Sequence, residues 1–235
     1  MIMINRKQLI EQVEAGFKRS PIVALTGVRQ CGKTTLARHY ASDKEHRFFD
    51  LEDPADSKAL DVPMLTLEKS PALVIIDEIQ RKPALFQVLR VLADKLEWRT
   101  NFLILGSASP DLVKGASESL AGRVAFVDMA GFSHEETGAD AMHDLWNRGG
   151  LPRSFLADDD NSSYAWRGDY IRTFLERDIP QLGIRIPAES LRRFWTMLAH
   201  YHGQTWNGAE LATSLGVSAP TVRHYLDILT GAFVV

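Results

Sequence analysis

The sequence predicts an α/β fold, in which helices cover both faces of a parallel sheet and an all-helical region follows. Five short apolar runs alternate with stretches of helical periodicity; they are residues 22–26, 47–51, 73–76, 102–105 and 123–127. Strands that alternate with helices are typical of parallel sheets. Two of the runs, ALVII and FLIL, are apolar on both faces, as buried parallel strands require. From residue 131 to residue 230 every predicted element is helical.

The helices are predicted from apolar residues at spacings of three and four. The first spans 5–19 and puts Leu9, Val13 and Phe17 on one stripe, and two more, 34–40 and 83–96, lie between predicted strands. Ser133 followed by Glu136 is a capping-box pattern that begins the second region. The predicted helices of that region are 134–147, 153–158, 162–178, 188–202, 207–215 and 218–230.

The bulk composition restricts the class of protein. The chain has 235 residues, of which 45% are hydrophobic and 24% charged, so it is long enough for one α/β domain and a smaller second one. The net charge of −3 argues against a basic field over the whole molecule. Cys31 is the single cysteine, which excludes an internal disulfide. No apolar stretch is long enough for a membrane span or a signal core, and we expect a cytoplasmic protein with no membrane partner.

A glycine-rich loop joins the first predicted strand to the helix at 34–40. It matches the pattern G-x-x-x-x-G-K-[ST], and its residues are Gly27, Val28, Arg29, Gln30, Cys31, Gly32, Lys33, Thr34 and Thr35. The glycines let successive backbone N–H groups turn toward phosphates, and the helix N-terminus adds partial positive charge. Lys33 supplies a cation for the β- and γ-phosphates, and Thr34 supplies a hydroxyl ligand for Mg²⁺. The loop therefore predicts binding of a nucleoside triphosphate with Mg²⁺.

Two adjacent carboxylates follow the most apolar strand. Asp77 is expected to hold Mg²⁺ opposite Thr34, and Glu78 to polarise the water that attacks the γ-phosphorus. The sequence has no Asn-Lys-x-Asp guanine-binding motif, and small-molecule kinases with such a loop usually lack the adjacent glutamate. What remains is the ATPase branch with an extra strand, here 47–51. We therefore predict ATP as the ligand and its hydrolysis as the reaction.

Two later residues complete the predicted catalytic set. Ser107 follows the strand 102–105 and is a candidate sensor of the γ-phosphate; the alternative is a simple turn or cap residue. Arg123 comes just before the last strand, where oligomeric ATPases carry an arginine that neutralises transition-state charge. The alternative for Arg123 is a surface salt bridge. For both Ser107 and Arg123, the sequence leaves the catalytic and the structural role open.

Taken in order, six segments resemble the AAA-superfamily ATPases, specifically the archaeal-type branch related to the STAND signalling ATPases. The segments are GVRQCGKTTL, VIIDEIQR, LILGSASP, SLAGR, GGLPRSFLA and YIRTFLERDIPQLGI. The resemblance implies a P-loop NTPase sheet of order 5-1-4-3-2, a helical lid and a winged helix, which we assign to 1–131, 132–187 and 188–235. It also implies that a Gly-x-Pro motif packs on the adenine. Here that motif is Gly150-Leu151-Pro152, and Pro152 takes the role.

The end of the sequence departs from the pattern of this branch, whose members usually continue into a nuclease-like domain. Residues 231–235 are predicted to form the first strand of a wing with no partner strand, so we expect a truncated product. No nuclease activity follows from the resemblance.

A helix-turn-helix pattern precedes that end, with Gly216 at the turn and Ser218 at the start of the second helix. Residues 203–235 hold one basic residue, Arg223, against Glu210 and Asp227, which argues against strong DNA binding. An ATPase that works on a macromolecule and a STAND-like switch with slow hydrolysis both stay open. A homo-oligomer and nucleic acid stay open as partners.

Overall fold

The computed structural model describes residues 4–95, 100–107, 119–181 and 184–235. The chain divides into two compact units, Met1–Leu156 and Ala157–Val235, which are treated separately below. The three-part division at residues 131 and 187 remains a prediction. Among the described residues, no helix combines the length and apolar character needed to cross a membrane.

The first unit is built on a sheet of five parallel strands in the order β2-β3-β4-β1-β5. The strands are β1 (Ile22–Gly27), β2 (His46–Asp50), β3 (Leu73–Asp77), β4 (Asn101–Ser107) and β5 (Val124–Met129). Ile22 lies beside Phe102 of β4 and Val124 of β5, so the amino ends of these strands lie together at one end of the sheet and their carboxyl ends at the other. The predicted fold class and the order 5-1-4-3-2 are confirmed.

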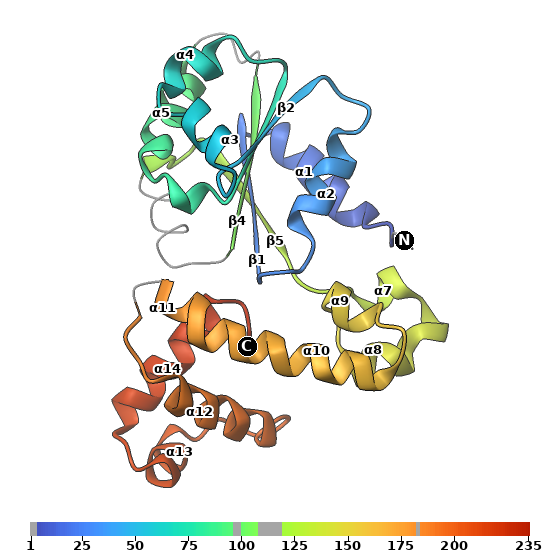
Figure 1. Ribbon diagram of the computed structural model, residues 1–235, viewed down its shortest axis with the longest axis vertical. Helices are drawn as coiled ribbons and strands as arrows, with labels where there is room; N and C mark the ends of the chain where they lie inside the picture. The colour runs from blue at the N-terminus through green and yellow to red at the C-terminus, as the bar shows by residue number, and fades with distance from the viewer. Residues whose placement is uncertain (1–3, 96–99, 108–118, 182–183) are drawn as a thin grey trace. The chain divides into compact units, whose positions relative to one another are not determined.

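The helices of this unit are α1 (Lys7–Phe17), α2 (Lys33–Ala41), α3 (Pro54–Ala59), α4 (Pro63–Glu68), η1 (Ile79–Arg81), α5 (Ala84–Asp94), α7 (His134–Thr137), η2 (Ala139–Ala141), α8 (Met142–Arg148) and α9 (Pro152–Phe155). Helices α1 and α2 lie on one side of the sheet and α3, α4 and α5 on the other, as Figure 1 shows. On one face, Ile22 and Ile104 pack with Leu89 of α5 in a buried core. On the other, a Cβ on Gly16 of α1 would lie 2.9 Å from Val23, so the close approach of α1 to β1 requires glycine.

The second unit is helical in its described residues. Its elements are α10 (Asp160–Thr173), η3 (Phe174–Asp178, one π-helical stretch), α11 (Ile179–Gln181), α12 (Ala188–His200), α13 (Gly208–Leu215) and α14 (Ala219–Gly231). Side chains at positions 207 and 218 cap α13 and α14, and Gly216 turns between them at φ 69°. Phe194, Leu211 and Leu229 lie at the centre of a separate apolar core. This unit therefore has a core of its own.

Two sequence expectations about regular structure are wrong. The single helix expected over 134–147 is broken into α7, η2 and α8, because Gly138 takes φ 81° and ends the first turn. The strand expected over 231–235 does not form: Gly231 belongs to α14 and Phe233 takes φ 59°. The N–H groups of Phe233 and Val234 donate to the carbonyls of Thr230 and Leu229, at 2.9 and 3.0 Å. These two bonds close a Schellman-type helix end instead of starting a wing strand.

Candidate nucleotide-binding site

The glycine-rich loop follows the carboxyl end of β1 and leads directly into α2, as predicted. Gly27 has φ 158°, and a Cβ there would lie 2.0 Å from the Met129 carbonyl oxygen, so this step of the loop accepts only glycine. Gly32 is the residue before α2, at φ 98°. Gln30 has φ 63°, a conformation that costs energy in a residue with a side chain and is found where the surroundings hold it for a purpose. The loop is a concave backbone turn at a helix N-terminus, which is the form that phosphate oxygens require.

Lys33 lies inside this loop. Its side chain is buried, and Nζ donates to the carbonyl oxygens of Gly27 and Val28, both at 2.9 Å. The ammonium is therefore held within the turn whose N–H groups would surround a phosphate. Binding phosphate oxygens requires it to exchange these carbonyls for them.

Behind the loop, a chain of hydrogen bonds joins the residues predicted to hold Mg²⁺. Thr34 Oγ1 donates to Asp77 Oδ2 at 2.6 Å, and the Glu78 N–H donates to Asp77 Oδ1 at 2.9 Å. Burial raises the pKa of Asp77, and the nearby Asp50 carboxylate raises it further, while the bonds from Thr34 and Glu78 act in the other direction. The Thr34 hydroxyl and the buried Asp77 carboxylate lie within hydrogen-bond distance of each other. Both are hard oxygen ligands, so the residues present fit Mg²⁺.

Glu78 follows Asp77 with its backbone at φ 53° and ψ 44°, in the left-handed region. This unusual backbone turns the chain sharply after β3, and the Gln80 amide donates to Glu78 Oε2. Burial raises the pKa of Glu78, as does the Asp77 charge, and the charges of Arg29 and Lys33 oppose the rise. A partly buried carboxylate whose pKa is raised is a better proton acceptor than an exposed one, as a general base requires.

A cavity of about 290 Å³ opens on the other side of the loop. Its walls are mostly apolar, and they come from the N-terminal segment, the loop, α2, the end of β5 and α9. The residues are Ile4, Arg6, Cys31, Gly32, Thr35, Leu36, His39, Met129, Phe132, Pro152 and Leu156. A pocket of this size with apolar walls and few polar groups suits a purine base. Pro152 is among the lining residues, and its Cγ would lie 3.8 Å from a Cβ on Gly32.

The backbone explains how Pro152 reaches this wall. The Phe132 N–H donates to the Gly150 carbonyl oxygen at 2.6 Å. A Cβ on Gly131 would lie 2.5 Å from the Gly150 backbone, and one on Gly150 would lie 2.5 Å from the Phe132 carbonyl. Because both positions exclude larger residues, the segment after β5 and the start of α9 lie in backbone contact. Gly150, the glycine of the Gly-x-Pro motif, thus has a packing role in addition to any ligand contact.

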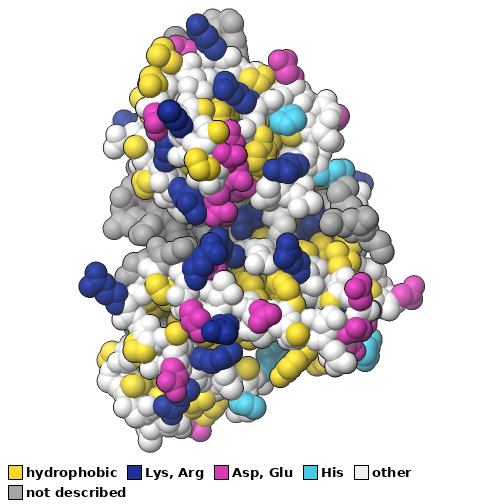
Figure 2. Space-filling model, in the orientation of Figure 1, with side chains coloured by type: hydrophobic (Ala, Val, Ile, Leu, Met, Phe, Trp, Pro, Cys, Tyr) yellow, Lys and Arg dark blue, Asp and Glu magenta, His cyan; other side chains and the backbone are white. Residues whose placement is uncertain are grey.

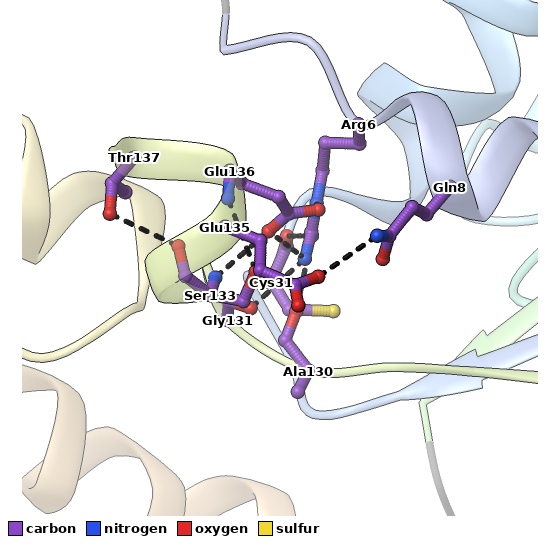
Figure 3. Close-up of polar contacts among 9 residues, drawn as sticks. All are labelled: Arg6, Gln8, Cys31, Ala130, Gly131, Ser133, Glu135, Glu136 and Thr137. Atoms are coloured by element: carbon purple, nitrogen blue, oxygen red, sulfur yellow. Dashed lines mark hydrogen bonds and ion pairs between the residues drawn. The ribbon is translucent and has the colours of Figure 1, made fainter. Parts of the chain in front are cut away.

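Arg6 lies in the wall of this cavity, and Figure 3 shows its polar contacts with Glu136 and with three backbone carbonyls. Its side chain is 8% exposed and forms a two-point ion pair with Glu136, Nε to Oε1 at 2.7 Å and Nη2 to Oε2 at 3.0 Å. Its remaining donors bond backbone carbonyls, at 3.3, 3.1 and 2.9 Å, of Cys31, Ala130 and Gly131. All five N–H groups of the guanidinium are therefore used. Glu136 also closes the capping box with Ser133 that the sequence predicted.

Arg6 and most of the cavity wall were not predicted from the sequence. A lone arginine ahead of an amphipathic helix carries no pattern, and its partners lie 25 to 130 residues away along the chain. Phe132 and Met129 also gave no signal, because an aromatic and a methionine near a strand end are equally typical of a core. Cys31 is fully buried in this wall, and burial raises the pKa of its thiol.

Of the two remaining predicted site residues, Ser107 lies beside the loop and Arg123 does not. Ser107 ends β4, and its backbone pairs with Gly27, but its side chain lies outside the described part of the structure. Arg123 precedes β5 and lies at the opposite edge of the sheet from the loop. It forms a two-point ion pair with Asp94, one contact being Nη2 to Oδ2 at 3.1 Å. Since β1 is six residues long, about 20 Å separates that edge from the loop.

Two known protein families match this chain, one over each part of it. The model of a family described as AAA domain matches residues 19–138, just over half of the chain. A second model, described as a domain of unknown function (DUF8612), matches residues 139–235. The boundary between the two matches falls just after the capping-box turn at Ser133.

Two curated relatives and one solved structure are similar to this chain. Uncharacterized proteins of Mycobacterium tuberculosis and Mycobacterium bovis are each 53% identical over 234 residues, which cover 100% of this chain and 53% of theirs. The chain thus spans about half the length of the curated relatives it matches. A structure described as the Walker-type ATPase of Pyrococcus abyssi has a TM-score of 0.67 at 14% identity, over 98% of this chain and 90% of its own. That likeness shows a shared fold.

Proposed function

The chain belongs to the AAA-domain family, and from that premise we propose that it is a Mg²⁺-dependent ATP hydrolase. The hydrogen-bonded chain from Thr34 through Asp77 to Glu78, directly behind the loop, carries the proposal. It supplies the two oxygen ligands and the adjacent base that hydrolysis needs. A site that served only to bind nucleotide has no need of a second carboxylate, Glu78, directly beside the metal ligands.

In the proposed reaction, Lys33 and the loop N–H groups hold the β- and γ-phosphates, and Glu78 accepts a proton from water. The water oxygen bonds to the γ-phosphorus as the bond to the β–γ bridging oxygen breaks, and that oxygen leaves with the electron pair as part of ADP. Thr34 and Asp77 would hold Mg²⁺, which would supply positive charge to the phosphate oxygens. We assign Ser107 as a sensor of the γ-phosphate, and Arg123 as a contribution from a neighbouring subunit.

The experiment is phosphate release from ATP by the whole chain, with Mg²⁺ and with EDTA. We expect Glu78→Gln to lower turnover by about 10²- to 10⁴-fold while ATP affinity is kept, because it removes a general base but no phosphate ligand. Glu45→Gln, at an exposed position, is the matched control and should leave turnover unchanged. Equal turnover in Glu78→Gln and the native chain would show the mechanism to be wrong.

A second candidate, a nucleotide-dependent switch with slow hydrolysis, is favoured by one observation. Pro152 and Leu156 line the cavity, and Leu156 is the last residue of the first unit. A base in the cavity would therefore contact the residues that lead directly into the second unit. Positive and negative side chains are interspersed over the face drawn in Figure 2, which does not favour a nucleic-acid motor over a switch. Turnover with and without DNA separates the two, because a DNA motor is stimulated and a switch is not.

A further inference from the structure

Arg29 is the third residue of the phosphate loop, and its side chain takes part in a charged cluster that the proposed reaction has not used. Arg29 Nη2 lies 3.8 Å from Glu52 Oε1. The same Glu52 oxygen accepts a hydrogen bond from Arg81 Nη2 at 2.9 Å. Glu52 is thus shared between one arginine from the loop and one that follows Glu78.

The order of the sheet tells which side of the loop Arg29 faces. Glu52 comes two residues after β2, and Arg81 comes four residues after the end of β3. Both strands lie on the same side of β1, whereas β5, which leads to the base cavity, lies on the other. The Arg29 guanidinium therefore lies toward the carboxylates Asp77 and Glu78. The γ-phosphate must lie on that side too, since the cavity for the base is at the opposite end.

The charge balance on this side of the loop favours the same placement. The carboxylates gathered here are Asp50, Glu52, Asp77 and Glu78, and a triphosphate brings more negative charge to the same point. A cation that can move to the phosphate offsets part of that repulsion.

The contact with Glu52 is one that a phosphate can replace. At 3.8 Å it is longer than a hydrogen bond, and the Glu52 side chain is 44% exposed, so water screens the pair. A phosphoryl group offers a guanidinium two short, charge-assisted bonds instead. Glu52 keeps its hydrogen bond from Arg81 when Arg29 leaves, so the exchange does not leave the Glu52 carboxylate without a cation.

We propose that Arg29 is the arginine that neutralises charge on the γ-phosphate during hydrolysis, supplied by the chain's own loop, and that Glu52 holds it aside until the phosphate takes its place. This inference rests on the proposed ATP hydrolysis. It gives the site an arginine in its own chain, whereas Arg123 lies at the far edge of the sheet and is paired with Asp94. Arg29 is then a catalytic residue, and Glu52 positions it.

The test uses the whole chain with three variants: Arg29→Ala, Arg29→Lys and Glu52→Gln. Arg29→Ala should lower turnover about 10²- to 10³-fold, the effect of losing one preorganised donor to transition-state charge. Arg29→Lys should recover only part of the loss, because an ammonium cannot make the two-point contact. Glu52→Gln should raise turnover by up to about fivefold, since a screened ion pair no longer competes for the arginine.

Calorimetric titration with ADP and with the non-hydrolysable analogue AMP-PNP decides the inference independently of turnover. Arg29→Ala should weaken AMP-PNP binding about tenfold or more and leave ADP within twofold, because a charge-assisted bond to the γ-phosphate is lost. Arg90→Ala, exposed on α5, is the matched control and should change neither ligand. Equal losses for ADP and AMP-PNP, or turnover within twofold of the native chain, would overturn the role of Arg29. If the native chain releases no phosphate, the proposed hydrolysis fails, and the ratio of the two affinities still decides whether Arg29 contacts the γ-phosphate.

Discussion

On the β5 side of the phosphate loop the Arg6 guanidinium is fully bonded to protein partners, whereas on the β3 side charged groups are held by partners that a nucleotide would replace. Arg6 uses all five of its donors on Glu136 and three backbone carbonyls, and the cavity it borders is walled by apolar side chains. Lys33, by contrast, is bonded to two loop carbonyls, and Arg29 is paired with a half-exposed carboxylate. The side proposed for the base is thus fixed in advance, and the side proposed for the phosphates would have to exchange contacts. Substitutions on the first side should therefore lower stability, and substitutions on the second side should weaken ligand binding.

Removing Arg6 should have the largest effect, and the effect should be on stability. Arg6→Ala leaves Glu136 without its ion pair at a buried point, which lowers the free energy of unfolding by about 3 kcal/mol. Chemical denaturation followed by circular dichroism measures it. Gln8→Ala is a matched control, because it removes a single exposed bond of 2.9 Å to Glu135 in the same cluster and should cost no more than about 0.5 kcal/mol. If the two variants were equally stable, the contacts of Arg6 would not be what stabilises the β5 side of the loop.

Removing Lys33 should act on the ligand instead. Lys33→Ala should weaken ATP binding by roughly 10- to 100-fold, because a charged donor to phosphate is worth about 1.5–3 kcal/mol. Titration calorimetry gives the affinity, and denaturation of the same variant should show a smaller loss of stability than Arg6→Ala. Lys18→Ala, at an exposed position, should change neither. A stability loss as large as that of Arg6→Ala would mean that the lysine is part of the fixed scaffold.

Removing the Thr34 hydroxyl tests the metal side alone. Thr34→Val should weaken ATP binding about tenfold in the presence of Mg²⁺, as loss of a group that holds or orients a metal typically does, and should leave binding in EDTA unchanged. The informative quantity is the ratio of the two affinities, because it is insensitive to general damage to the loop. An equal loss with and without Mg²⁺ would exclude Thr34 as a metal ligand and leave only its bond to Asp77.

How far sequence predicts this molecule also differs between the two sides. The loop, Asp77 and Glu78 were predicted because phosphate and Mg²⁺ need particular residue types at fixed spacing after buried strands. The sheet order was predicted through the resemblance to a known family, not from the residues alone. On the side proposed for the base, Pro152 was the one residue predicted to contact the base, and Cys31, Gly32 and Thr35 were predicted as part of the phosphate loop. The rest of the wall was missed, because it is assembled from segments whose apolar residues look like those of any core.

Two backbone details explain the remaining errors. The helix expected over 134–147 was inferred from a capping box and an apolar pattern that are both present, but Gly138 at φ 81° interrupts it. The strand expected over 231–235 rested on three apolar residues, and whether such residues continue a helix end or begin a strand depends on tertiary contacts. Phe233 at φ 59° could not be foreseen, because a bulky residue rarely takes a left-handed backbone.

The smallest effect should come from the base wall, at the one position there that the sequence predicted. Pro152→Ala removes about two methylene groups from the cavity, worth roughly 1 kcal/mol of contact with a base, or about a fivefold loss of affinity. The loss should be the same for ATP and ADP, since Pro152 is remote from the phosphates, and inorganic tripolyphosphate should bind with unchanged affinity. Because proline suits the first position of α9 but does not determine the Gly150 contact, the variant should keep its stability to within about 1 kcal/mol.

That pattern separates contact with the base from a purely structural role of Pro152. A packing role alone would lower stability and weaken tripolyphosphate along with ATP, since the loop and the wall would loosen together. Direct contact weakens only the ligands that carry a base. If the base-bearing ligands lost nothing, the cavity beside Arg6 would not be the base site, and the fixed side of the loop would have another purpose. The proposed difference between the two sides therefore depends on the effect of Pro152→Ala as much as on that of Arg6→Ala.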